Sequence, residues 1–571
     1  MVNLKINGIA VSVPEGSTIL QAAKLANVRI PTLCYLKETQ CIGSCRMCLV
    51  EATGARGLVA ACVYPVSEGM EVKTNTPKVR KSRKTSLELI LSTHKKKCLS
   101  CVRSMNCELQ KLALEYNAEE DKFGTDHDLK PIDDLSPSVV RDNSKCIMCT
   151  RCVAACEKQT IGVIGPKNRG YSKTIGSPFD VSLAFTSCVN CGQCVVACPV
   201  GALSEKSNVA DVWGAIVDPT KKVVFFTAPS VRATLGEAFG LPVGTNVEGK
   251  MVAAIKQLGD VECFNMDTTA DLTIMEEATE LLSRLKNGGK TPMFTSCCPG
   301  WIKFCEHYYP EFLPNLSTCK SPQEMFSALL KTYYCQKNGI KPENLYVVSV
   351  IPCTAKKFEV TRDELGNYTD AAITTRELAK MIKEAGVDFA NLSDADYDDP
   401  FGLASGAGAI FGATGGVMEA ALRTAAKALG DEDEPIVFNE VRGTQGIKEA
   451  TYTLGGNTVK VAIASGLGNA RSLLDAIKRG EKEYTFVEIM ACPGGCVNGG
   501  GQPYVHDEIR NNVDLKALRA KALYDYDGKS ATRCSHENAT VTKLYEEFFG
   551  EPNSHKAHEL LHTHYAARPK Y

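Results

Sequence analysis

Short runs of alternating apolar and polar residues open the chain. The runs Val2–Ile6 and Ile9–Val13 flank Asn7-Gly8, a dipeptide that favours the tight turn of a β-hairpin. Ser17 stands where an N-cap would begin a helix extending to residue 26, because its hydroxyl can accept a backbone N–H of the first turn. The N-terminal pattern therefore predicts strand, turn, strand and helix, followed by a loop that contains several cysteines.

A different pattern begins near residue 209. Apolar runs rich in β-forming residues, such as 223–226 and 346–350, alternate with helical stretches, which predicts a layered α/β domain. Functional groups in such folds tend to sit just past the strand ends. Three segments in that position contain cysteine: 294–301, 351–357 and 490–496. We therefore expect a site where these three loops meet, with the glycine-rich residues 499–503 close to it.

One helical segment places charged residues on a single face. Glu277, Glu280 and Arg284 recur at helical spacing, and the apolar set on another face is Ile274, Ala278, Leu281 and Leu285. By composition alone, Glu280 and Arg284 would form a surface ion pair. The last stretch, from about 535 to 562, predicts helices whose histidines serve as surface or packing residues.

Composition narrows the class of protein. The chain has 571 residues, enough for three or four domains, and its 65 basic and 66 acidic side chains give a net charge of −1. That balance argues against a broadly basic nucleic-acid binder. No run approaches the roughly 18 apolar residues that cross a bilayer, and the first residues lack an apolar leader. We therefore expect a cytoplasmic protein that binds neither nucleic acid nor membrane.

Cysteine is the anomaly, with 26 residues of which sixteen lie in the first 198 positions. Such density without a secretory leader indicates metal or redox sites rather than disulfides. One run, Cys146-x2-Cys149-x2-Cys152-x3-Cys156, recurs as Cys188-x2-Cys191-x2-Cys194-x3-Cys198. This duplication matches the bacterial two-cluster ferredoxin pattern, in which the fourth cysteine of each run ligates the other cluster. The predicted ligand sets are Cys146, Cys149, Cys152 and Cys198 for one [4Fe–4S] cluster, and Cys188, Cys191, Cys194 and Cys156 for the other.

A second constellation is His94-x3-Cys98-x2-Cys101-x5-Cys107. Taken alone, one imidazole and three thiolates would also suit zinc. Its position between two predicted cluster domains favours a [4Fe–4S] cluster with one His ligand. The basic run at 78–84, which precedes it, is interpreted as a solvated helical face, with docking of an acidic electron carrier as the alternative.

The N-terminal strands, helix and cysteine loop resemble a β-grasp ferredoxin. The cysteine spacing resembles that of the N-terminal domain of the iron–sulfur subunit of NADH-quinone oxidoreductase. That resemblance selects Cys34, Cys45, Cys48 and Cys62 as ligands of a [2Fe–2S] cluster, which needs four thiolates, and leaves Cys41 as a bystander.

The three C-terminal loops together resemble the active-site signatures of the iron–iron (FeFe) hydrogenases. The signatures here are Thr295-Ser296-Cys297-Cys298-Pro299, Pro352-Cys353-Thr354 and Cys492-Pro493-Gly494-Gly495-Cys496. The resemblance implies a six-iron H-cluster, in which a [4Fe–4S] cubane is bridged by one thiolate to a two-iron unit carrying carbon monoxide, cyanide and azadithiolate. The positions that match the cubane ligands are Cys298, Cys353, Cys492 and Cys496, and Cys496 matches the bridging thiolate.

The resemblance also implies roles for residues around the two-iron unit. Lys356 matches the donor to one cyanide, and Ser230 within Ala228-Pro229-Ser230 can serve the other. Gln323, Phe411 and Met490 match further pocket positions. The residues that resemble the family's proton route to solvent are Cys297, Glu277, Ser317, Glu280 and Arg284. Ile351, Ala355 and Pro493 depart from frequent family residues, which leaves redox tuning and directional bias in doubt.

These features predict a multidomain α+β protein. The expected domains are a β-grasp [2Fe–2S] ferredoxin domain at 1–78, a small His/Cys3 [4Fe–4S] domain at 79–125, a two-[4Fe–4S] bacterial ferredoxin domain at 126–208 and a large α/β H-cluster domain at 209–571. The total is one [2Fe–2S] and three accessory [4Fe–4S] clusters beside the H-cluster. The expected function is reversible dihydrogen oxidation and proton reduction.

The expected partners follow from the same resemblance. Gly289-Lys290-Thr291 and Gly466-x-Gly468 lack the further glycines of nucleotide-binding loops, so ferredoxin is favoured over NAD(P)H as the electron carrier. Maturation proteins would supply the two-iron unit, and a monomer is expected. Two alternatives are an iron–sulfur electron-transfer subunit of a larger redox complex and a non-catalytic hydrogen sensor.

Overall fold

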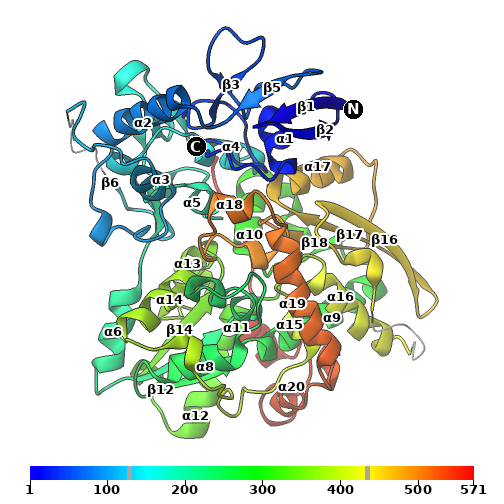
Figure 1. Cartoon of the computed structure of the whole chain (residues 1–571). Coiled ribbons are helices and arrows are strands. Elements are labelled where there is room, and N and C mark those ends of the chain that lie inside the picture. Colours follow the sequence, from blue (N-terminus) through cyan, green and yellow to red (C-terminus); the bar gives the residue numbers. More distant parts are fainter. Residues whose placement is uncertain (125–131, 431–436, 571) are drawn as a thin grey trace.

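The computed structural model describes residues 1–124, 132–430 and 437–570. The cysteine-rich N-terminal modules gather at one end of the molecule, and the large C-terminal region forms the other (Figure 1). The predicted boundary between the second and third domains, at residues 125 and 126, lies outside the described residues. No helix in the described ranges is both long and apolar enough to span a membrane.

The N-terminal module is a five-stranded sheet with the order β2-β1-β5-β3-β4. Its strands are β1 (Val2–Ile6), β2 (Ile9–Val13), β3 (Leu49–Ala52), β4 (Val59–Ala60) and β5 (Glu71–Lys73), and α1 (Ile19–Leu25) packs on them. The predicted hairpin is present: Ile6 pairs with Ile9, and Asn7 and Gly8 both have positive φ, as the turn requires.

The start of α1 corrects one prediction. Its N-cap is Thr18 rather than Ser17, because the Thr18 hydroxyl accepts from the Gln21 N–H at 3.3 Å and the Gln21 side chain accepts from the Thr18 N–H at 2.7 Å. This capping box needs Glu or Gln three residues after the cap, and only the pair Thr18 and Gln21 has that spacing. Ser17 instead donates its backbone N–H to Pro14 in the preceding turn.

Two small modules follow. The first consists of α2 (Pro77–Ser92) and α3 (Glu108–Glu115), which flank the His94 and Cys98–Cys107 segment. The second contains α4 (Arg151–Lys158) and α5 (Gln193–Ala197), with the strands β6 (Ile132–Asp133), β7 (Val139–Asp142) and β10 (Leu203–Glu205) in one sheet and β8 (Gly165–Lys167) and β9 (Thr174–Gly176) in another.

The C-terminal region contains two four-stranded sheets. The first has the order β12-β11-β14-β15 and is entirely parallel, from β11 (Lys222–Thr227), β12 (Val261–Asn265), β14 (Leu345–Ile351) and β15 (Ala371–Thr374). The second has the order β13-β18-β17-β16, from β13 (Met293–Phe294), β16 (Ile447–Leu454), β17 (Asn457–Ser465) and β18 (Phe486–Met490). Only the β16–β17 pair is antiparallel, at the edge of the second sheet.

Helices cover both sheets. Those of the C-terminal region are α6 (Val209–Val217), α7 (Pro229–Arg232), α8 (Glu248–Lys256), α9 (Asp267–Asn287), α10 (Pro299–Tyr308), α11 (Pro322–Leu329), α12 (Cys335–Asn338), α13 (Ala355–Glu359), α14 (Thr375–Glu384), α15 (Gly406–Ile410), α16 (Gly416–Ala428), α17 (Leu467–Lys478), α18 (Asp507–Arg510), α19 (Leu515–Lys529), α20 (Ala539–Leu544) and α21 (His555–Leu561). Residues 223–227 of β11 are all buried, as expected of a parallel strand covered on two faces. The α/β prediction for this region is confirmed.

Candidate active site

Four strand ends from the two sheets converge on one place. The chain leaves β11 into Ala228-Pro229-Ser230, β13 into Cys297-Cys298, β14 into Cys353, and β18 into Cys492 and Cys496. These strands are parallel to their neighbours, so their carboxyl ends share one edge of each sheet, and the loops beyond them can meet. The expectation that the three cysteine loops lie together at strand ends is confirmed.

The four thiols predicted to hold the cubane line one small enclosed cavity, formed by Cys298, Cys353, Cys492 and Cys496 together with Cys191, Gly300, Ala355, Met490, Ala491, Gly495 and Gly499. The wall has no charged side chain. Burial, followed by the negative charge of the other thiols, raises the pKa of Cys353 to about 12 and raises that of Cys492 well above its usual range. Crowded, desolvated thiols of this kind favour a cationic group that they can bind as thiolates, so the donor set fits an iron–sulfur cubane.

A second cavity of about 80 Å³ adjoins the first and shares Cys298, Cys353, Cys496 and Met490 with it. Its wall also contains every other residue predicted to surround the two-iron unit: Ala228, Pro229, Ser230, Cys297, Gln323, Lys356 and Phe411. Most of this wall is apolar, and Lys356 is its charged member. A compact unit held by one thiolate and a few donors fits such a lining.

Lys356 is fixed by a carboxylate that the sequence did not single out. Its Nζ lies 2.8 Å from Glu359 Oε2, one turn later in α13, and that oxygen also accepts from Gln323 Nε2 at 3.1 Å. Burial alone would lower the pKa of Lys356, but Glu359 outweighs it and raises the pKa. The ammonium therefore stays charged at the cavity wall. The i, i+3 spacing of Lys356 and Glu359 was a signal that could have identified the pair.

Ser230, in α7, also lines this cavity. Its Oγ accepts from Gln502 Nε2 at 3.4 Å, and the side-chain oxygen of Gln502, Oε1, accepts from the Thr234 hydroxyl at 2.7 Å. Gln502 belongs to the glycine-rich stretch expected to approach the cofactor. Gly500 in that stretch has no room for a side chain, because a Cβ would lie 2.3 Å from the Cys191 carbonyl oxygen.

The residues predicted to carry protons form a buried line along α9. Cys297 stands at the cavity wall, and Glu277 is the first charge, after burial, that raises its pKa. Ser317 Oγ donates to Glu280 Oε2 at 3.0 Å, and Arg284 Nη2 donates to Glu280 Oε1 at 2.5 Å. The structure thus brings all five predicted positions together, from the cavity to a partly exposed arginine.

Burial on this face differs from what composition suggested. Glu277 and Glu280 are 1% and 9% exposed, so Glu280–Arg284 is not a surface ion pair. Leu285, expected on the buried face, is 42% exposed, because the last turn of α9 extends beyond the elements that pack on the helix. Neither Glu277 oxygen has a hydrogen-bond partner among the described residues. Burial and then the charge of Glu280 raise the pKa of Glu277 to about 8, so its carboxyl can gain and lose a proton near neutral pH.

The duplicated cysteine runs fold as an interlocked pair. The pKa of Cys152 is raised by burial and then by the facing thiols Cys149, Cys198 and Cys146, whereas that of Cys194 is raised by burial and then by Cys191, Cys188 and Cys156. The fourth cysteine of each run therefore lies among the first three of the other. Met148 and Thr150 have positive φ, as do Asn190 and Gly192 at the corresponding positions of the second run. Both loops thus curl in the same way around their thiols.

The structure also shows contacts at the other two predicted cluster sites. In the N-terminal module, Cys48 Sγ lies 3.4 Å from Cys62 Sγ, and the Cys45 N–H points at Cys34 Sγ at 3.5 Å, while Cys41 is exposed. Such pairs suit a [2Fe–2S] cluster, in which each iron takes two thiolates. In the next module, His94 Nδ1 faces the Lys145 carbonyl at 2.9 Å, which places the proton on Nδ1 and the lone pair on Nε2, the nitrogen suited to a metal.

The cluster sites follow one another through short contacts. Gln40 Nε2 donates to the carbonyls of both Cys34 and Cys149, at 2.9 and 2.7 Å. Gly201 leaves room for Cys101 Sγ, since a Cβ there would lie 2.4 Å from it. The predicted [2Fe–2S] and His/Cys3 sites thus both lie beside the predicted cluster site formed by Cys146, Cys149, Cys152 and Cys198. Cys191 of the other set lines the cubane cavity, which completes a path to the active site.

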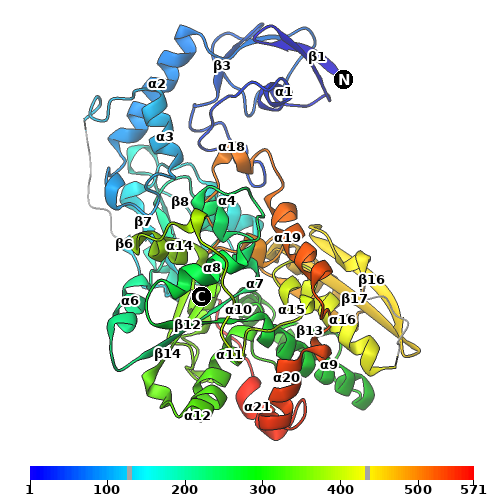
Figure 2. The same cartoon turned by 60° about the horizontal axis from the view of Figure 1, so that its bottom comes forward.

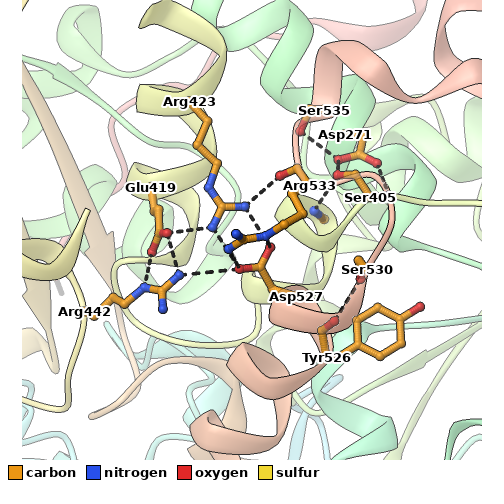
Figure 3. Close-up of polar contacts among 11 residues, drawn as sticks. Asp271, Ser405, Glu419, Arg423, Arg442, Tyr526, Asp527, Ser530, Arg533 and Ser535 are labelled. Carbon is orange, nitrogen blue, oxygen red and sulfur yellow. Dashed lines mark hydrogen bonds and ion pairs between the residues drawn. The ribbon is translucent and has the colours of Figure 1, made fainter. Parts of the chain in front are cut away.

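A buried polar network, shown in Figure 3, holds the helix that leads to Phe411. Asp527 of α19 accepts from Arg423 and Arg533 at 2.7–2.9 Å, and Glu419 accepts from Arg423 and Arg442 at 2.6–2.8 Å. Nearby, Asp271 of α9 accepts from Ser405, the N-cap of α15, and from Ser535. These contacts fix α15 between α9 and α19, and Phe411 follows α15 at the cavity.

Comparison with known protein families assigns most of the chain. The matching family models are "2Fe-2S iron-sulfur cluster binding domain" (residues 1–77), "NADH-ubiquinone oxidoreductase-G iron-sulfur binding region" (83–122), "4Fe-4S dicluster domain" (145–202), "Iron only hydrogenase large subunit, C-terminal domain" (221–500) and "Iron hydrogenase small subunit" (513–568). The second of these models favours iron–sulfur over zinc for the His94 region.

Individual relatives agree with the family models. NADP-reducing hydrogenase subunit HndD of Solidesulfovibrio fructosivorans is 48% identical, with 100% of both chains covered. Iron hydrogenase 1 of Clostridium pasteurianum is 45% identical over 99% of this chain and 100% of its own. A variant of apo [FeFe]-hydrogenase HydA1 from Chlamydomonas reinhardtii has a solved structure that matches with a TM-score of 0.57 and 41% identity, covering 64% of this chain and 100% of that one.

Proposed function

Because this chain belongs to the iron-only (FeFe) hydrogenase family, we propose that it interconverts dihydrogen with protons and electrons at the paired cavities, and that it exchanges those electrons with a ferredoxin-type carrier. The observation that carries the proposal is the pair of adjoining cavities. One is lined by four thiols, and the other shares three of these and adds Cys297 and Lys356 to its wall.

The H-cluster, when bound, supplies the open metal position and the amine base at which dihydrogen is split. Cys298, Cys353, Cys492 and Cys496 would hold its cubane, with Cys496 shared with the two-iron unit. Lys356 offers a positive charge to an anionic ligand, and its ion pair with Glu359 keeps the ammonium oriented. Ser230, which lines the same cavity, would offer a hydroxyl donor to the unit. The apolar remainder of the wall excludes water, which strengthens both interactions.

Protons would pass through the chain's own side chains. The Cys297 thiol would exchange a proton with the active site and with Glu277, whose raised pKa allows both of its protonation states near neutral pH. Ser317 and Glu280 continue the line, and Arg284 ends it at a partly exposed position. Helix α9 carries Glu277, Glu280 and Arg284, so it sets the spacing of three of the five groups.

Electrons would follow the cluster sites. From the cubane they would first reach the cluster site that contains Cys191, because that cysteine lines the cubane cavity. They would next reach the site formed by Cys146, Cys149, Cys152 and Cys198. The last step would lead to either the [2Fe–2S] or the His/Cys3 site. We propose one [2Fe–2S] and three accessory [4Fe–4S] clusters with the ligands given above. We further propose a monomer in the cytoplasm and loading of the two-iron unit by maturation proteins.

The test of catalysis combines two measurements. The protein is matured anaerobically, and its infrared bands from iron-bound carbon monoxide and cyanide are recorded together with hydrogen evolution from a reduced dye. Both signals are expected. Bands without turnover would favour a hydrogen sensor, and the absence of both would favour an electron-transfer subunit. Cys353→Ser is expected to abolish both signals, whereas Cys335→Ser, at a buried cysteine far from the loops, should abolish neither.

The carrier is tested separately, because HndD is named as NADP-reducing. Reduced ferredoxin and NADPH are each supplied as the only electron donor to the purified chain. We expect hydrogen from reduced ferredoxin and none from NADPH. Hydrogen from NADPH alone would overturn the carrier assignment without affecting the assignment of the active site.

A further inference from the structure

His562, at the carboxyl end of α21, is a buried histidine that the five-residue proton route does not use. Only 7% of it is exposed. Its Nδ1 lies 2.8 Å from Thr318 Oγ1, and its Nε2 lies 3.1 Å from Glu276 Oε2. Helices α9, α20 and α21 gather at the same end of the catalytic region (Figure 2). A ring held at both nitrogens in this way is oriented for proton transfer as well as for packing.

Thr318 links this histidine to the proton route. Its hydroxyl lies 3.2 Å from Glu280 Oε2, and its backbone N–H donates to the same oxygen at 3.0 Å. Glu280, Thr318, His562 and Glu276 therefore form one continuous hydrogen-bonded line. We propose that the proton route branches at Glu280 and that Thr318 and His562 form a second outlet, parallel to Arg284. This proposal rests on the hydrogenase function proposed above.

The number of hydrogens available in this line determines when all its hydrogen bonds can form at once. Glu276, as a carboxylate, can only accept, so His562 Nε2 carries a proton and Nδ1 accepts from the Thr318 hydroxyl. That hydroxyl has a single hydrogen and cannot also donate to Glu280. When Glu280 is protonated it donates to Thr318 instead, and every bond in the line then points outward. The branch is thus oriented by the proton that arrives at Glu280.

The transfer balances as a relay. The Glu280 proton passes to Thr318 Oγ1 while the Thr318 hydrogen passes to His562 Nδ1, so the threonine ends as it began. The imidazolium then releases its Nε2 proton toward Glu276 or toward the surface. His558, which is exposed, has its ring centroid 4.3 Å from that of His562 and stands at the outer end. In proton reduction the same steps run inward.

Several charged or titratable groups surround His562. Those on α9 are Glu276 and Glu280, and Glu280 is also paired with Arg284. Tyr545 donates to Glu276 Oε1 at 2.5 Å, and Cys319 Sγ lies 3.9 Å from Glu280 Oε2. On α21, His558 and the exposed His555 complete the set. The ring therefore lies among several groups that can exchange protons, and the hydrogen bonds to Thr318 and Glu276 select which of them it contacts directly.

The test is a double-mutant cycle between the two outlets. His562→Gln can keep a hydrogen bond to each neighbour but cannot accept a proton near neutral pH. We expect about a 2-fold loss of dye-coupled dihydrogen oxidation from His562→Gln alone, and a further loss of about 10-fold when it is added to Arg284→Leu. If the two outlets work in parallel, the loss of rate in the double mutant should exceed the product of the losses in the two single mutants. A double-mutant rate equal to that product would overturn the proposal.

Two further readouts separate a relay from packing. Added imidazole should restore part of the rate of His562→Gly in the Arg284→Leu background, and no rescue would count against the relay. The ratio of Arg284→Leu activity to double-mutant activity should also change between pH 5 and 8, where imidazole changes charge, whereas a packing defect gives a constant ratio. His564→Gln, at an exposed position two residues away, is the matched control. Unchanged infrared bands would show that the active site itself is intact.

Discussion

The N-terminal modules and the C-terminal region both gather cysteines, but they do so in opposite ways. In the modules most ligands come from short runs such as Cys146–Cys156, and positive φ at Met148 and Thr150 curls the loop around its thiols. In the C-terminal region the four thiols come from three loops between Cys298 and Cys496, and two sheets bring them together. Ligands that are close in sequence can be brought together by a single turn. Ligands that are far apart in sequence need a packed core to hold the loops that carry them.

The two regions also treat protons differently. The accessory cluster sites would need only to pass electrons. Polar groups near them, such as Gln40, donate hydrogen bonds to backbone carbonyls. Both regions bury ionisable side chains, but buried charges of the modules are paired, as Arg151 is with Glu108, whereas neither Glu277 oxygen has a hydrogen-bond partner among the described residues. Such a group lowers stability and is retained where its titration is used. In the function proposed above, electron transfer and proton transfer would therefore be separated in space and would meet at one cavity.

The strongest test of this separation is Cys297→Ala. Loss of the thiol should lower dihydrogen turnover by about 10²- to 10⁴-fold, the range expected when a proton donor is removed. The infrared bands should remain, since Cys297 is not a predicted ligand. Cys305→Ala, at a buried cysteine of α10, is the control and should keep its turnover. Normal turnover in Cys297→Ala would show that protons reach the cavity by another route.

A second test concerns Glu277. Glu277→Gln removes the titrating group and should lower turnover by about 10²-fold. The variant should also change how stability depends on pH. The folded-state pKa is about 8, whereas the ordinary pKa of a glutamic acid is 4.5. The neutral carboxyl therefore stabilises the fold fully below pH 4.5, and this contribution is lost as pH rises through 8.

The melting temperature of the catalytic region is the readout for that change. Glu277→Gln stays neutral at every pH, so it should lose less stability than the parent between pH 5 and pH 8. Identical pH profiles for the two proteins would mean that Glu277 is not a buried acid with a raised pKa.

A third change is confined to the N-terminal modules. Cys101→Ser should impair the His/Cys3 site and lower ferredoxin-linked turnover by about 10-fold if that site is the main point of electron exchange. Turnover with a small dye should change less, because dyes can reach inner clusters. Cys41→Ser, at the exposed cysteine without a predicted role, is the control. Equal losses with dye and ferredoxin would show that the modules are needed for folding rather than for docking.

The smallest effect on turnover is expected from Asp527→Asn. The change removes the buried carboxylate that Arg423 and Arg533 share, and leaves Arg423 paired with Glu419 (Figure 3). Breaking a buried ion pair costs about 3–5 kcal/mol, so the melting temperature should fall clearly. Turnover per folded molecule should change by less than about 2-fold. Glu481→Gln breaks an exposed ion pair with Arg479 and should leave the melting temperature unchanged.

Much of the site was readable from spacing and from family resemblance. All predicted cavity residues, from Ala228 to Met490, line the two cavities, and the fourth cysteine of each duplicated run lies among the first three of the other. The misses are of two kinds. Ser17 was named as a cap although Thr18 has the partner at the right spacing, which is a local signal overlooked. Leu285 was placed in the core because periodicity alone does not show where a helix leaves its neighbours.

The sequence by itself determined the kinds of cluster and the chemistry of the catalytic loops, because cysteine spacing and strand–loop patterns are local. The tertiary structure decided which groups share a site across long separations. Glu359 holds Lys356, Gln40 joins two cluster sites, and His562 reaches Glu280 through Thr318. Tertiary packing also buried most of the pair Glu280–Arg284, which composition alone would place at the surface and which ends the proposed proton route. Desolvation and long-range contact depend on the whole fold, so no short pattern in the chain could reveal them.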